Sequence, residues 1–137
     1  MLPSVRFNWK KHDCAVGLVM DREQIEVFAR GLYHLANVDG IDDSEMAIIS
    51  EFLTEHNAEE VMESLPSATF DLNQAFDVFE TAFLRRVFLK ASIVMVRADG
   101  VLSDEERTAI AEVADAFGQA DLLGELEAEV ADVTSFD

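Results

Sequence analysis

The sequence predicts an all-α protein, folded as a compact bundle of about six to seven helices. Apolar residues recur at intervals of three and four along most of the chain, which is the spacing of one buried helix face. No segment shows the apolar–polar alternation that is typical of a strand. Hydrophobic residues make up 50% of the 137-residue chain, so it can bury a core large enough to fold without a metal or a disulfide.

The domain organisation is simple. We expect an N-terminal arm or helix over 1–20, whose form the sequence leaves open, and one helical domain over 21–137. Within the domain, the order long helix, Asp-Gly turn, acidic helix occurs twice, over about 21–65 and over about 71–131. Two copies indicate an internal duplication with an approximate two-fold axis, because a solenoid needs more repeats.

The first repeat begins with a helix for which Asp21 is the expected N-cap, in a capping box with Gln24. Apolar residues follow on one face up to the turn at Gly40, where the missing side chain permits unusual backbone angles. A second helix is predicted over roughly 43–56. A short helical piece comes next and is expected to end at Pro66, because proline cannot continue a helix.

The second repeat opens with large apolar residues at helical spacing between 76 and 94, which predicts a buried helix. Where this segment breaks into separate elements is left open. Ser103 with Glu106 forms another capping box, so a helix is expected to begin there and to close at Gly118. A last helix is predicted over about 119–131.

The acidity of the chain limits its partners. The net charge is −18 at pH 7, residues 38–67 contain many carboxylates and no Lys or Arg, and a single Arg follows residue 98. Such a protein should repel nucleic acid and anionic lipid, so cations and basic protein surfaces are the expected partners. Solubility or a high-salt habitat would explain the same acidity, and composition does not decide among these explanations.

A basic cluster interrupts the acidic sequence at Arg85, Arg86 and Lys90. It is a candidate docking site for an acidic partner, although pairing inside the bundle is the favoured explanation. No stretch resembles a membrane span or an export signal, and the lone Cys14 fits a reducing compartment. We therefore expect a cytoplasmic protein that does not insert directly into a membrane.

Catalytic patterns are missing from the sequence. The three histidines lack metal-protease spacing, and there is neither a glycine-rich phosphate loop nor a nucleophile elbow. Carboxylates on an acidic surface carry no catalytic signal unless burial shifts their pKa values. The sequence thus predicts a binding protein and no enzyme. A buried carboxylate with a shifted pKa in a closed pocket would revive the enzymatic alternative.

The two Asp-Gly turns are the candidate site. Aligning Asp39 with Asp99 places Glu45 on Glu105. An EF-hand is excluded because both loops lack oxygen ligands at their first positions. The favoured explanation of each residue is structural, as a turn-forming Asp or as a Glu in the first turn of a helix, and a metal site is the alternative. If the turns lie close together, these four carboxylates would form a shared site for a divalent cation such as calcium. No other cofactor is predicted.

The two Asp-Gly segments of the sequence resemble those of a known family. YHLANVDGIDDSEMAIISEFL (33–53) and SIVMVRADGVLSDEERTAIAEVADAFG (92–118) are similar to the two signature segments of the TerB-like tellurite-resistance family. The shared pattern is an apolar helix ending in Ala-Asp-Gly, a short turn, and a Glu within an amphipathic helix. The first copy departs from it at Val38 and Asp42. The resemblance covers about residues 21–118.

The resemblance implies a bundle of roughly seven helices that acts as a binding or adaptor module in bacterial stress, tellurite or metal resistance. It implies a protein partner in a stress-response complex, membrane-associated where the domain belongs to a DnaJ-type co-chaperone. Candidate cation ligands remain Asp39, Glu45, Asp99 and Glu105. The alternative is a metal-independent, scaffold or co-chaperone-like interaction module that uses an apolar groove or its acidic face. No sequence pattern indicates the oligomeric state.

Overall fold

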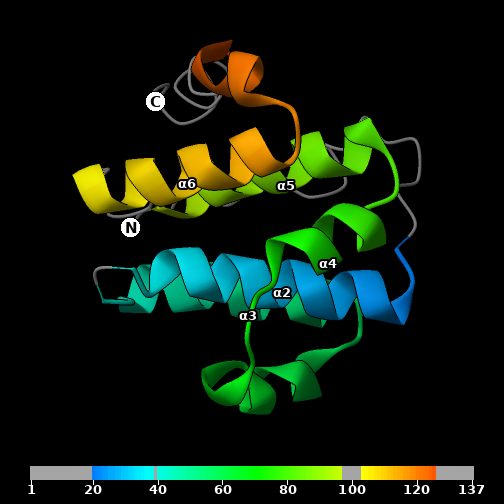
Figure 1. Cartoon of the computed structure of the whole chain (residues 1–137). Helices are drawn as coiled ribbons and strands as arrows, with labels where there is room; N and C mark the ends of the chain where they lie inside the picture. Colours follow the sequence, from blue (N-terminus) through cyan, green and yellow to red (C-terminus); the bar gives the residue numbers. More distant parts are fainter. Residues whose placement is uncertain (1–19, 39, 97–102, 126–137) are drawn as a thin grey trace, which may run out of the picture.

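The computed structural model describes residues 20–38, 40–96 and 103–125, and every regular element in these ranges is a helix (Figure 1). The elements are α2 (Arg22–Ala36), α3 (Asp43–Glu55), the 3-10 helix η1 (Glu59–Ser67), α4 (Leu72–Val78), α5 (Ala82–Val96), α6 (Asp104–Ala116) and the 3-10 helix η2 (Ala120–Leu122). The all-α prediction is confirmed. The predicted N-terminal arm or helix, and the last helix beyond residue 125, lie outside the described residues.

Two helix pairs form the body of the molecule. Helix α2 packs against α3, and α5 packs against α6, so each pair joins a long helix to the one that follows its Asp-Gly turn. Helix α2 also packs on α5, which joins the pairs, and α4 lies across α2 and α6 (Figure 1). The internal duplication and its two-fold axis stay predictions.

A cluster of phenylalanine rings forms the centre of the core. The ring of Phe28 on α2 stacks on Phe52 of α3, with centroids 4.6 Å apart, and meets Phe88 of α5 edge-on at 5.1 Å. Phe79 and Phe117 complete the cluster, each in contact with Phe88. Because these rings come from both helix pairs, their burial holds the pairs together.

Gly31 on α2 makes room for two of the aromatic rings. A Cβ built there would lie 2.5 Å from Cζ of Phe88 and 2.8 Å from Cε1 of Phe70. No side chain fits at such distances without moving the rings. The glycine therefore lets Phe70, which precedes α4, reach the surface of α2.

Three helices in the described residues begin with a capping box. Asp21, Asp42 and Ser103 are the N-caps of α2, α3 and α6, and each forms a capping box with the residue three positions later. Gly40 has a φ of 98°, the left-handed backbone that glycine adopts without steric cost. The local sequence thus sets where these three helices begin.

One helix boundary differs from the sequence prediction, and a second, which the sequence left open, is placed by the structure. Helix η1 continues through Pro66 and ends at Ser67, because a proline near the end of a 3-10 helix removes only one donor. The open break in the second repeat falls between Val78 and Ala82. No helix in the described residues is long and apolar enough to cross a membrane.

Candidate functional site

Glu45 and Glu106 occupy the same position at the starts of α3 and α6. The backbone N–H of Asp42 donates to Oε1 of Glu45 at 3.1 Å, and the N–H of Ser103 donates to Oε1 of Glu106, also at 3.1 Å. In return, the cap side chains accept the N–H groups of the two glutamates. Each glutamate is therefore fixed by its own helix start.

The two glutamates also meet each other in the interior. Glu45 is 2% exposed and Glu106 is 5% exposed, and their carboxyl groups share a hydrogen bond. Burial is the largest influence on Glu45, and with the charges of Asp42 and Glu106 it raises the pKa of Glu45 to about 8. The hydrogen bond from the Asp42 backbone opposes this rise. The raised pKa therefore favours the protonated form of Glu45 at neutral pH.

The alignment that placed Glu45 on Glu105 is wrong by one residue at the helix starts. Two residues lead from Gly40 to the cap Asp42, but three lead from Gly100 to the cap Ser103. Glu105 consequently lies on the exposed side of α6, and Glu106 is the structural equivalent of Glu45. The signal was present in the sequence, because aligning the two capping boxes pairs the correct glutamates.

The other candidate cation ligands cannot be placed in the same way. Asp39 and Asp99 lie outside the described residues. Within the ranges that the structure describes, no cluster of three or more His, Cys, Asp or Glu side chains has an arrangement suited to a metal. The cation site therefore stays a prediction. Glu45 is its buried candidate ligand among the described residues.

The basic cluster on α5 is engaged within the fold. The guanidinium carbon of Arg85 lies 3.8 Å from the ring centroid of Phe76, and its Nη2 donates to the Phe76 carbonyl at 2.9 Å. Nη1 of Arg86 lies 4.0 Å from Oε1 of Glu125. Lys90 is half-buried on the same helix. These contacts favour the internal role that the sequence analysis preferred, and partner docking here stays a prediction.

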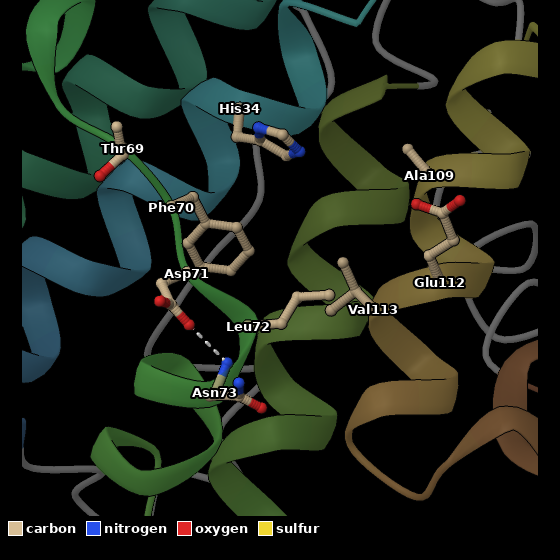
Figure 2. A pocket seen from close by; sticks show the side chains of 9 residues that line it. All are labelled: His34, Thr69, Phe70, Asp71, Leu72, Asn73, Ala109, Glu112 and Val113. Atoms are coloured by element: carbon tan, nitrogen blue, oxygen red, sulfur yellow. Dashed lines mark hydrogen bonds between the residues drawn. The ribbon is translucent and has the colours of Figure 1, made fainter.

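A surface groove is centred on His34, near the end of α2. It consists of three adjoining hollows of about 490, 450 and 490 Å³, all of which share this histidine. Its walls are the last turns of α2, the 66–73 segment and one face of α6. Figure 2 shows the middle hollow, with His34 and Phe70 on one side and Ala109 and Glu112 of α6 on the other. We call it the His34 groove. Sequence analysis missed it because it joins three distant segments.

Comparisons with known proteins were made against family models, curated proteins and solved structures. None of the three finds a match to this chain. The TerB-like resemblance therefore stays a prediction that rests on the two Asp-Gly segments.

Glu45 is the described carboxylate that bears on the enzymatic alternative. Glu45 meets the first condition that we set for an enzyme, because it is a buried carboxylate with a raised pKa. It lines none of the three hollows of the His34 groove. One of its oxygens accepts from the Asp42 backbone, and its carboxyl group bonds Glu106.

Proposed function

We propose that the protein is a non-enzymatic, acidic binding and adaptor module of a bacterial stress or metal-resistance system, acting in the cytoplasm. Its leading activity is divalent-cation binding at the junction of the two Asp-Gly turns. The contact between Glu45 and Glu106 carries this proposal, because it brings together the two helix starts that directly follow the turns. The TerB-like resemblance supports the same reading.

The remaining candidate ligands lie outside the described residues and are close to the two caps in the sequence. Asp39 comes three residues before Asp42, and Asp99 comes four before Ser103. Carboxylate oxygens suit calcium or magnesium, so the proposal assigns Asp39 and Asp99 to the same cation site as Glu45.

Calorimetric titration of the metal-stripped protein tests this proposal. Calcium, magnesium, zinc and manganese would be added at physiological salt to the wild type, to Asp39→Asn/Asp99→Asn and to Glu45→Gln. We expect saturable binding of low stoichiometry, accompanied by release of the Glu45 proton, that both variants lose. The matched control is Glu63→Gln/Asp77→Asn, which removes two exposed carboxylates elsewhere. Weak heats that are screened by salt and equal in all four proteins would refute the cation site.

The second candidate function is a metal-independent interaction module, scaffold or co-chaperone-like. The His34 groove favours it, since a groove with apolar and acidic lining is a surface on which a protein segment can bind. A negative titration would leave this function standing.

A further inference from the structure

We propose that the His34 groove binds an amphipathic segment of a partner protein. The apolar residues of that segment would fill the floor of the groove, and its Lys or Arg side chains would face the carboxylates of the rim. This inference goes beyond cation binding, because it uses a different surface, and it stands if no metal binds.

The floor of the groove is apolar and held in place by the core. Phe70 and Leu72 are half-buried, and Val113 of α6 is buried opposite them (Figure 2). The ring of Phe70 stacks on Phe88 with centroids 5.9 Å apart and lies 5.6 Å from the ring of His34. Because core contacts fix this ring, a bound segment would not have to order the floor first.

The rim of the groove is acidic. Asp104, Glu105 and Glu112 line the α6 side, are exposed, and form no ion pair with any residue in the part of the chain that the structure describes. Asp71 adds a fourth carboxylate on the opposite side of the middle hollow. Arg30 lines only the hollow of about 450 Å³, which α6 does not line. This excess of negative charge favours a basic segment and would orient it along α6.

The shape favours a segment of chain over a compact small molecule. Each hollow has a size that suits a few side chains, and the three adjoin around one histidine. Several shallow hollows in contact accommodate successive apolar residues, as one face of an amphipathic helix presents them at positions i, i+3 and i+4. The partner we infer is therefore a basic amphipathic helix or a comparable extended segment.

Fluorescence anisotropy of a labelled peptide tests the proposal with the full chain at physiological salt. The probe is an amphipathic Leu/Lys peptide of about 18 residues without tryptophan, compared with a scrambled peptide of the same composition. We expect the amphipathic order to bind more tightly, because only that order presents one apolar face. Equal binding of both peptides would show charge attraction alone and would overturn the proposal.

Ala109→Glu separates docking from charge attraction. Ala109 lines two of the hollows, so a glutamate there adds a negative charge and also obstructs both of them. Docking predicts binding of the peptide that is about tenfold weaker, whereas charge attraction predicts tighter binding. The control Ala47→Glu adds the same charge on an exposed face of α3 and should leave affinity unchanged or slightly higher. Similar effects of both substitutions would refute the groove.

A second variant, Glu112→Gln, keeps the proposal testable if Ala109→Glu does not fold. Glu112→Gln removes one exposed rim charge from the middle of α6 and should weaken peptide binding roughly two- to fivefold. Glu63→Gln, its control outside the groove, should leave binding unchanged. Equal effects of the two would contradict the acidic rim.

The emission of Trp9 distinguishes a partner from the chain's own N-terminal segment. It is the single tryptophan of the chain, so its fluorescence reports on residues 1–19. We expect Ala109→Glu to leave that emission unchanged when no peptide is present. A shift to longer wavelength would show that the chain's own segment occupies the groove, and the partner proposal would fall.

Discussion

Glu45 and Glu106 each act at two levels of structure. Within its own helix, each carboxylate accepts a hydrogen bond from the N-cap backbone, as the third residue of a capping box does. Between helices, the two carboxyl groups are buried against each other and are joined by a hydrogen bond. The contact between the helices also changes the acidity of Glu45, because burial beside Glu106 raises its pKa from 4.5 to about 8.

We predict that Glu45 makes folding stability depend on pH between about 4.5 and 8. Because its pKa is raised in the folded state, the folded protein binds more protons than the unfolded chain in that window. The stabilisation from its protonated form is complete below pH 4.5 and is lost as pH rises to about 8. Glu45→Gln removes this titration and keeps an oxygen for the Asp42 N–H, so its free energy of unfolding should vary less with pH.

Urea unfolding at intervals from pH 5 to pH 9 measures this difference. Relative to Glu45→Gln, the wild type should lose free energy of unfolding steadily up to about pH 8 and then level off. Glu63→Gln, an exposed control of the same chemistry, should follow the wild type. Parallel curves for wild type and Glu45→Gln would show that Glu45 has an ordinary pKa.

At the scale of elements, helix starts are predictable where a side chain caps them. Asp21 and Ser103 cap α2 and α6 at the positions that the capping-box pattern indicates. The break before α5 carried a weaker signal of the same kind. There the hydroxyl of Thr81 accepts the N–H of Leu84 at 3.1 Å. Phe79, just before Thr81, is fully buried in the core. A local sequence pattern cannot reveal that the core places a ring at this position.

Ser103→Ala should destabilise the protein by about 1 kcal/mol, because it deletes the hydroxyl that accepts the N–H of Glu106 at 3.1 Å. The glutamate would keep its bond from the residue 103 N–H, so the loss should stay within the range of a single cap. Thermal or urea unfolding at fixed pH measures the change.

Two substitutions control this measurement. Ser103→Thr retains a capping hydroxyl and should recover most of the lost stability. Ser50→Ala makes the same chemical change at an exposed position within α3 and should cost nothing, because alanine favours the helix interior. If Ser103→Ala and Ser50→Ala were equally stable, the cap would have no energetic role.

At the scale of the whole molecule, charge opposes compactness. The net charge of −18 has few balancing cations, and the ion pair of Arg22 with Glu60 is more than half exposed on both sides. Exposed pairs of this kind contribute little to stability. Repulsion among carboxylates is therefore the larger electrostatic effect on the folded state.

We predict that added salt stabilises the protein. Two like charges about 10 Å apart in water repel by about 0.4 kcal/mol, and salt at 1 M screens such pairs almost completely. Over the whole surface, the gain between about 0.05 and 1 M NaCl should be on the order of 1–2 kcal/mol. Urea unfolding midpoints measure it, and choline chloride should act alike because screening depends on ionic strength. A midpoint that stays constant or falls would contradict the prediction.

The fold class, the capped helix starts and the acidic surface were determined by the sequence, because each depends on residue spacing or on composition. Tertiary structure decided which residues meet. It paired Glu45 with Glu106 in place of Glu105, since burial follows helix packing and the two turns differ in length by one residue. It also assembled the His34 groove from α2, the 66–73 segment and α6. Contacts between segments so far apart arise only when the core packs, so no local pattern encodes them.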